Sequence, residues 1–459
     1  MQKQERSQML GAMPMGKLVP KICTPIMVSM LVQALYNIVD SMFVARYDAM
    51  ALTAVSLAMP IQMLMISVGT GLGTGINSVI SRRLGEGRGE EARRAAANGW
   101  FLQVLGCLLF MVYALTLVKP TFALMTDDPT LIALGSDYLQ IVCLVSIGLF
   151  MAINFERLLQ STGNSTLSMC AQLTGAITNI ILDPIMIFGY CGLPAMGIKG
   201  AAIATVIGQM LGSCVGFTLN QLKNSELRLS LKGFRPDGTI IRNILAVGIP
   251  SMVMSSIGSV MNVTMNMILF AYGPVAVSVL GVYFKLQSFI FMPVFGLSNG
   301  MVAIVGYNYG ARNRKRVYKA LKVSLTWAVT IMAIGMAAFL IFPDALLSLF
   351  EAGEASDLTR MGRVALRTIC WCFLPASVCI TLSTVFQAVG KGMYSLIMSL
   401  CRQLLVLLPS AWLLSTLVGS VDAVWWAFVI AEVSSLVMVL FMFRRVDRTL
   451  LRKLDEVEA

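Results

Sequence analysis

Three acidic residues lie inside apolar stretches of the chain, where a carboxylate needs a reason to be present. Asp40 is enclosed by LYNIVDSMFVAR (35–46), and Glu156 and Asp183 have similarly apolar neighbours. An ionised carboxylate in the apolar part of a membrane costs about 3 kcal/mol or more unless it is paired or faces a polar cavity. In a partly dry cavity such a group can bind a proton, Na⁺ or an organic cation. The three acids are therefore candidates for ion coupling.

Uncharged polar side chains accompany these acids at helical spacing. Four polar residues recur at i, i+3, i+4 and i+7 and so share one face of the first long apolar segment: Gln33, Tyr36, Asn37 and Asp40. Asn179 lies one helical turn before Asp183, whereas Asn154 and Glu156 are two residues apart and do not share a face. We expect a polar lining inside the first half of the chain. The residues predicted to line a substrate cavity are Gln33, Tyr36, Asn37, Asn154 and Glu156.

The composition indicates that a membrane surrounds these residues. Of 459 residues, 57% are hydrophobic and only 13% are charged, and the mean hydropathy is +0.79. A soluble domain is nearer a quarter charged, so this chain is predicted to be an integral membrane protein. The net charge of +12 comes from short basic clusters between apolar runs, which favours membrane topology over nucleic-acid binding. The absence of histidine excludes His-based triads, His-ligated zinc and imidazole proton relays.

About twelve apolar runs are long enough to cross a bilayer, which takes roughly 20 helical residues. They lie near 20–45, 51–80, 96–118, 131–155, 165–189, 197–219, 243–271, 276–305, 319–342, 363–386, 394–418 and 422–443. The predicted fold class is an all-α integral membrane protein with about 12 transmembrane helices. We expect these helices to form two six-helix lobes around a central cavity.

The two halves of the chain resemble each other at a separation of 225 residues. The matching pairs include Pro25 and Pro250, Asn37 and Asn262, Gln62 and Gln287, Gly71 and Gly296, Gly75 and Gly300, Gly85 and Gly310, and Pro184 and Pro409. Each repeat holds an even number of spans, so both enter the membrane from the same side and are related by an axis along the membrane normal. The predicted units are a first lobe (1–220), an inter-lobe loop (221–240) and a second lobe with a basic tail (241–459).

Basic clusters predict the orientation. They all fall on the side of the N-terminus: SRRLGEGRGEEARR (81–94), the loop 221–240, GARNRKRVYK (310–319) and RRVDRTLLRK (444–453). The opposite loops hold acidic segments such as TDDP (126–129) and EAGEASD (351–357). By the positive-inside rule, both termini are expected in the cytoplasm.

The acids of the first half are not repeated in the second. The positions that match Asp40, Glu156 and Asp183 hold Met265, Ser383 and Leu408. A carboxylate needed only for the shared fold should recur, so we assign these acids to an asymmetric function. The alternative is that each acid is a buried polar group bonded to a neighbouring helix. The charged residues of the second half, Lys285, Arg402 and Glu432, leave two interpretations open: Glu432 pairs with either cation, or Lys285 lines the cavity.

Pro25 precedes Asp40 in the first span and removes one backbone hydrogen bond from the helix. Bending at Pro25 could move Asp40 between environments, which makes Pro25 a candidate hinge. A static kink is the alternative, because Pro250 repeats the proline in the half that lacks the acid.

Several motifs together resemble one known family. They are LYNIVDSMFVAR in the first span, SRRLGEG after the second, LLQSTGNS after the fourth, NIILDPIMIFG in the fifth and GIKGAAIAT at the start of the sixth. The chain is similar over nearly its whole length to the multidrug and toxic compound extrusion (MATE) family. Glu156 points to the MepA-like branch of bacterial drug exporters.

This resemblance implies secondary antiport and no enzymatic activity. The expected substrates are amphipathic, often cationic, drugs, exported by alternating access across a bacterial plasma (inner) membrane in exchange for H⁺ or Na⁺. The resemblance assigns the cation site to Asp40, Asn179, Asp183, Ala201 through its carbonyl, and Thr205 through its hydroxyl. No other cofactor or metal and no nucleic acid is expected, and the protein is expected to be a monomer in the lipid bilayer.

Four other functions stand as alternatives. A lipid-linked precursor flippase of the same superfamily often has fourteen spans and a basic cavity, whereas the charges placed here are acidic. An exporter of one specific metabolite is another alternative. An intramembrane enzyme would need a nucleophile–base pair or metal cluster, and a channel would need a symmetric filter or charge ring.

Overall fold

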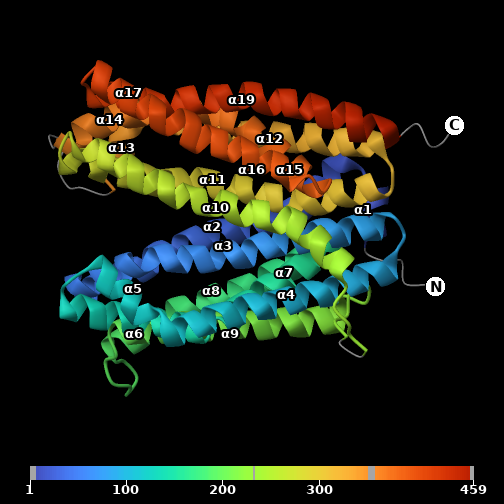
Figure 1. Cartoon of the computed structure of the whole chain (residues 1–459), viewed down its shortest axis with the longest axis horizontal. Helices are drawn as coiled ribbons and strands as arrows, with labels where there is room; N and C mark the ends of the chain where they lie inside the picture. Colours follow the sequence, from blue (N-terminus) through green and yellow to red (C-terminus); the bar gives the residue numbers. More distant parts are fainter. Residues whose placement is uncertain (1–6, 231–232, 350–356, 455–459) are drawn as a thin grey trace.

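The computed structural model describes residues 7–230, 233–349 and 357–454, and all regular secondary structure in these ranges is helical (Figure 1). The long helices of the first half are α2 (Met15–Tyr47), α3 (Ala49–Gly85), α4 (Gly89–Thr116), α6 (Pro129–Leu144), α7 (Ile147–Ser161), α8 (Ser165–Phe188) and α9 (Ile198–Lys223). Those of the second half are α10 (Gly238–Phe270), α11 (Pro274–Gly310), α12 (Arg314–Ile341), α14 (Asp357–Ile369), α15 (Phe373–Ala388), α16 (Gly392–Leu400), α17 (Leu408–Leu417) and α19 (Trp426–Val446).

Short elements connect or interrupt these helices. They are α1 (Gln8–Ala12), α5 (Val118–Met125), α13 (Pro343–Leu347), α18 (Val421–Val424), the 3₁₀ turns η1 (Cys370–Cys372) and η4 (Arg452–Leu454), and the π-helical segments η2 (Cys401–Leu407) and η3 (Asp447–Leu451). The 3₁₀ turn η1 divides one span into α14 and α15, and the π-helical segment η2 divides another into α16 and α17, because each departs from the regular i→i+4 hydrogen-bond pattern.

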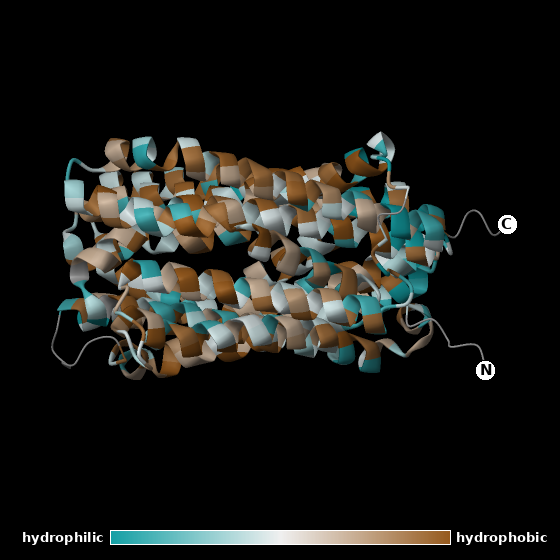
Figure 2. Cartoon of the chain, turned by 90° about the horizontal axis from the view of Figure 1, so that it is seen from below, coloured by the Kyte–Doolittle hydropathy of each residue, from teal (hydrophilic) through white to brown (hydrophobic). Residues whose placement is uncertain are grey.

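The predicted number of spans is confirmed. Within the described ranges, 11 helices are long and apolar enough to cross a membrane, and a twelfth span results if α6 and α7, bent by 45° at residues 145–146, count as one. In Figure 2 brown, apolar residues predominate along the middle of the molecule, and teal, hydrophilic residues are densest at the end that carries the termini. The acidic segment EAGEASD lies almost entirely outside the described residues.

The helices form two bundles, lower and upper in Figure 1, with both termini at the same end of the molecule. In the first-half bundle α8 packs against α2 and α9, and in the second-half bundle α15 packs against α12 and α19. The beginning of α2, including Leu18 and Ile22, is buried in the hydrophobic core of the second half. The chain therefore links the bundles through helix packing as well as through the loop 221–240.

Repeat-matched glycines form the seam between the bundles. A Cβ atom added to Gly85 would lie 2.0 Å from the carbonyl oxygen of Tyr307, and one added to its counterpart Gly310 would lie 2.1 Å from that of Arg82. Gly75 of α3 faces the backbone of α10 as closely, and Gly296 of α11 faces that of α2. Only glycine permits such backbone approaches, which explains why these glycines recur in both halves.

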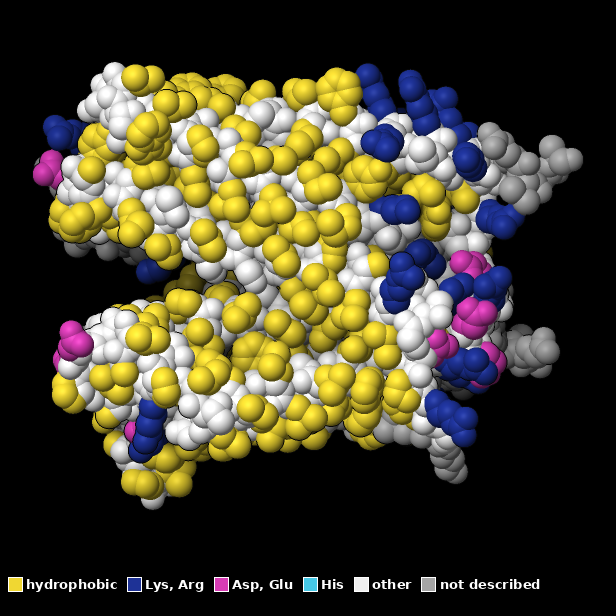
Figure 3. All heavy atoms as spheres, in the orientation of Figure 1, with side chains coloured by type: hydrophobic (Ala, Val, Ile, Leu, Met, Phe, Trp, Pro, Cys, Tyr) yellow, Lys and Arg dark blue, Asp and Glu magenta, His cyan; other side chains and the backbone are white. Residues whose placement is uncertain are grey.

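A cleft separates the bundles at one end. Figure 3 shows the molecule hollowed from the end opposite the termini, while Lys and Arg side chains gather at the terminal end. With the termini in the cytoplasm, as the positive-inside rule predicts, this cleft would open to the outside.

The N-terminal helix α1 joins segments of both halves at the terminal end. The Ser7 amide N–H donates to Glu226 Oε1 at 2.9 Å. Asn308 Nδ2 of α11 and Arg316 Nη2 of α12 each donate to the Leu10 carbonyl at 3.0 Å. These bonds satisfy the N–H group that precedes α1 and the Leu10 carbonyl group, which a helix this short cannot bond internally.

Candidate functional site

The carboxyl groups of Asp40 and Asp183 meet inside the first-half bundle. Asp40 lies on α2 and Asp183 on α8, two helices that pack against each other. Their carboxyls are close enough to share a hydrogen bond when one carries a proton. Asp183 is fully buried. Pro184, the next residue, has no N–H and so deprives the Ile180 carbonyl of its helical donor.

Helix α9 brings further oxygen atoms to this pair. Asn179 Nδ2 donates to Asp183 Oδ1 at 3.2 Å and lies 3.3 Å from Thr205 Oγ1 of α9. The approach is possible because Gly208 of α9 faces the carbonyl of Gly175 on α8, where a Cβ would lie 2.7 Å from that oxygen. Ala201, one turn before Thr205, is buried. The site predicted from the resemblance is thus built from α2, α8 and α9.

Several buried oxygens of this cluster lack a donor. Within the described part of the chain, Asp40 Oδ1, Asp183 Oδ2 and Asn179 Oδ1 have no hydrogen-bond partner. Two carboxylates this close repel each other unless a proton or a cation lies between them. The described residues include no group of three or more His, Cys, Asp or Glu side chains suited to a metal ion. Chemically, the cluster can hold a proton or a small monovalent cation through carboxylate, amide and hydroxyl oxygens.

The polar face of α2 continues from Asp40 into a side-chain network. Gln33 Oε1 accepts from Gln172 Nε2 of α8 at 2.6 Å, and Tyr36 bonds to Gln33. Asn37 is exposed on the surface of α2. Sequence reasoning did not single out Gln172, although it lies seven residues before Asn179 and so on the same helical face.

A second neighbour of Asp40 also escaped the sequence analysis. Tyr138 of α6 is buried close to Asp40, and its hydroxyl is 3.5 Å from Gln62 Oε1 of α3. In the sequence, Gln62 stands out only as the repeat partner of Gln287. No local spacing connects Tyr138 with Asp40, because their proximity arises from helix packing alone.

Asn154 and Glu156 belong to a different part of the first-half bundle. Gln160 Nε2 donates to Glu156 Oε1 at 2.9 Å, and Gln160 Oε1 accepts from Arg157 Nη1 at 2.9 Å. Gln160 therefore connects a buried guanidinium with the carboxylate on α7. Asn154 is fully buried, and both polar atoms of its side chain lack a partner in the described chain. Their assignment to a substrate cavity stays a prediction.

Helix α2 runs without interruption through the candidate hinge, Pro25. Ser29 Oγ donates to the Pro25 carbonyl at 3.0 Å. On either side of the proline, Cys23 and Met27 face Gly300 and Gly296 of α11 at the seam. A bend at Pro25 would therefore act where α2 leaves the second-half core, and this role stays a prediction.

In the second half, Glu432 of α19 pairs with Arg402 of η2. Arg402 Nη1 lies 2.6 Å from Glu432 Oε1, with side-chain exposures of 24% and 11%. Arg402 lies in a π-helical segment, in which the widened turn changes the direction of side chains. The structure thus resolves the open pairing in favour of Arg402, while Lys285 is exposed on α11.

Comparison with known proteins gives matches in both halves. The sequence model of the MatE family matches residues 25–185 and 250–413. The chain is 24% identical to the multidrug export protein MepA of Staphylococcus aureus (strain MRSA252) over 448 residues, 97% of each protein. It is 25% identical to MepA of Staphylococcus haemolyticus (strain JCSC1435) over 419 residues, 91% of each.

Solved structures with the same fold cover the whole chain. A MOP superfamily transporter from Pyrococcus furiosus superposes with a TM-score of 0.92 at 24% identity, covering 99% of this chain and 100% of that one. The outward-facing conformation of a multidrug resistance MATE family transporter gives the same values. The predicted family, fold and absence of an enzymatic role are therefore confirmed, and the chain belongs to the MatE family of membrane transporters, with MepA-like relatives.

Proposed function

We propose that the protein is a secondary antiporter that exports amphipathic organic cations in exchange for H⁺ or Na⁺. The observation that carries the proposal is the Asp40–Asp183 carboxyl pair, in which one buried oxygen of each group, Asp40 Oδ1 and Asp183 Oδ2, lacks a donor in the described chain. The description of the relatives as multidrug export proteins supports small drugs as the substrate class. The acidic character of the site favours cations among them.

The coupling ion neutralises the carboxyl pair. A proton would be shared between Asp40 and Asp183, whereas Na⁺ would take ligands from both carboxylates and Asn179. The Ala201 carbonyl and the Thr205 hydroxyl would complete a Na⁺ site. A neutral carboxyl pair can be enclosed in apolar surroundings during the conformational change. The free-energy cost is then several kcal/mol below that of enclosing a charged pair.

Neutralisation also links ion uptake to drug release. While the carboxyl pair is charged, it attracts a cationic drug into the cavity. Once an ion from outside has bound, this attraction weakens and the drug leaves through the open cleft. Release of the ion on the cytoplasmic side restores the charge of the carboxyl pair. The inward-open and outward-open states then differ in their affinity for the ion and for the drug, and coupling requires this difference.

We place the protein in the bacterial plasma membrane as a monomer, with both termini in the cytoplasm. The basic clusters on the terminal face support this orientation. No cofactor other than the coupling ion is needed for the proposed exchange.

Transport by the purified protein in liposomes tests the proposal. A pH gradient and a Na⁺ gradient are imposed separately, and movement of a fluorescent organic cation is recorded. We expect one of the two gradients to drive the dye against its own gradient, which also identifies the coupling ion. Dye movement that never exceeds equilibration under either gradient would contradict antiport.

A further inference from the structure

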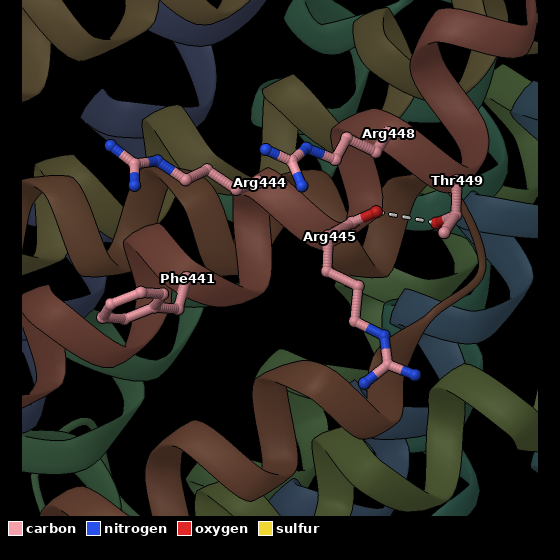
Figure 4. Close-up of a pocket in the computed structure, with 5 residues that line it drawn as sticks. All are labelled: Phe441, Arg444, Arg445, Arg448 and Thr449. Carbon is pink, nitrogen blue, oxygen red and sulfur yellow. Dashed lines mark hydrogen bonds between the residues drawn. The ribbon is translucent and has the colours of Figure 1, made fainter.

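An open pocket lies at the end of α19, on the face that carries both termini. Its volume is about 330 Å³. The lining residues are Phe441, Arg444, Arg445, Arg448 and Thr449. Figure 4 shows Arg444 and Arg448 extending to the same side, with the ring of Phe441 nearby, while Arg445 extends away from them. The i, i+4 spacing of Arg444 and Arg448 explains their common direction.

No carboxylate neutralises these arginines within the described residues. The acid nearest in sequence, Asp447, has other partners: the Tyr318 hydroxyl of α12 donates to one carboxylate oxygen and Arg452 Nε lies 3.0 Å from the other. The helix becomes π-helical at Asp447. The Thr449 hydroxyl donates to the Arg445 carbonyl at 2.8 Å. The pocket therefore combines three guanidinium groups that have no acidic partner among the described residues.

The basic cluster between α3 and α4 provides a contrast on the same face. There Arg83 pairs with Glu86 at 2.9 Å and with Glu91 at 3.2 Å, and Arg93 pairs with Glu90 at 2.7 Å. Topology alone requires only that basic residues be present on this side. Arg83 and Arg93 of the α3–α4 cluster thus have acidic partners, whereas Arg444, Arg445 and Arg448 have none among the described residues.

Apolar surface leads directly into the pocket. Phe441 is 65% exposed, and Val437, one turn earlier on α19, is 52% exposed. Val437, Phe441, Arg444 and Arg448 follow each other at helical spacing, so hydrocarbon surface and guanidinium groups lie along one side of the helix. A ligand that suits this surface carries an anionic phosphate at one end and an apolar chain at the other.

We propose that this pocket binds the phosphate headgroup of an anionic phospholipid, with an acyl chain along Val437 and Phe441. Guanidinium groups bind phosphate through paired, charge-assisted hydrogen bonds. A soluble phosphate would use the arginines alone and leave the apolar surface uncovered. The headgroup is predicted to be in the leaflet on the side of the termini, where the pocket opens.

Native mass spectrometry of the full-length protein in detergent tests this binding. The protein is titrated with phosphatidylglycerol and, separately, with phosphatidylcholine. We expect phosphatidylglycerol to bind about tenfold or more tightly than phosphatidylcholine. The double variant R444Q/R448Q should weaken phosphatidylglycerol binding on the order of thirtyfold, because each basic residue near an anionic lipid contributes about one factor of five.

The matched control is R83Q/R88Q, which removes two arginines on the same face that are paired with Glu86 and Glu91. It should leave phosphatidylglycerol binding within about twofold of the wild type, and R444K/R448K should retain most of it. If R444Q/R448Q does not fold, R448Q alone, with an expected loss of about fivefold, takes its place.

Four outcomes would overturn the proposal. Two outcomes would limit Arg444 and Arg448 to a role in membrane topology. One is equal affinity for the two lipids, and the other is an equal loss of phosphatidylglycerol binding in R444Q/R448Q and R83Q/R88Q. Displacement of the lipid by millimolar inorganic phosphate would indicate a soluble anion site. The last outcome concerns three acids outside the described residues, Asp455, Glu456 and Glu458. If lipid binds only after these acids are changed to amides, the C-terminal segment is the occupant of the pocket.

Discussion

Asp40 and Asp183 face each other as two acids in the first-half bundle, whereas Glu432 in the second half faces a base, Arg402. Two carboxylates cannot both remain charged at this separation without an ion between them, while the Arg402–Glu432 pair is neutral by itself. The bundles share a fold and an internal repeat, but the first holds two acids without a basic partner among the described residues, and the acid in the second is paired with a base. An ion-coupled step is therefore expected in the first half, and a constant structural pair in the second.

The largest expected effect is on transport by Asp40→Asn. The amide mimics the neutralised site, so gradient-driven export should fall to background while the protein stays folded. Asp183→Asn should act in the same way. Binding of a cationic drug should persist but weaken, because one attractive charge is lost.

The control for Asp40→Asn is Met265→Asn, the same amide at the matched position of the second half. Efflux in liposomes and equilibrium drug binding are measured for both. Retained gradient-driven efflux in Asp40→Asn, or equal losses in the two variants, would remove Asp40 from the coupling mechanism and abolish the contrast between the halves.

The next effect concerns stability, and its sign should differ between the halves. Glu432→Gln leaves Arg402 without a counter-charge and should lower the free energy of unfolding by about 2–3 kcal/mol. This is less than for a fully buried ion pair, because the Arg402 side chain is 24% exposed to solvent. Asp183→Asn removes repulsion and should leave stability unchanged or raised. Thermal unfolding in detergent compares the two acid-to-amide changes.

Replacing both partners, Arg402→Met with Glu432→Leu, provides the control for this comparison. The double variant should unfold near the wild-type temperature and retain export, since no charge is left unpaired. Loss of export in a stable double variant would show that the second half also takes part in coupling.

A smaller effect is expected for Glu156→Gln. Glu156 already accepts from Gln160, which also contacts Arg157, so its carboxylate resembles the paired acid of the second half more than the Asp40–Asp183 pair. Export should be reduced, but less than in Asp183→Asn. Initial efflux rates at equal expression compare the two variants, and a loss in Glu156→Gln equal to that in Asp183→Asn would make Glu156 a full member of the coupling site.

Much of the architecture was predictable because membrane folds follow hydrophobicity closely. Apolar runs gave the spans, since a helix must satisfy its own backbone hydrogen bonds in lipid. The break between α6 and α7 was not predicted, because the run 131–155 contains no proline and the bend depends on packing. The glycine pairs were visible as a repeat, but their role as the seam required the contact between α3 and α11.

The sequence by itself determined that Asp40, Asn179 and Asp183 lie on polar helix faces, because side chains three, four and seven residues apart share a face. Only the tertiary structure decided that the carboxyl groups of Asp40 and Asp183 meet, that Tyr138 and Gln172 join their surroundings, and that Glu432 pairs with Arg402 rather than with Lys285. Helical periodicity fixes the direction of each side chain around the axis of its own helix. Which faces meet depends on how helices distant in sequence pack, and that choice is made by the summed fit of many side chains.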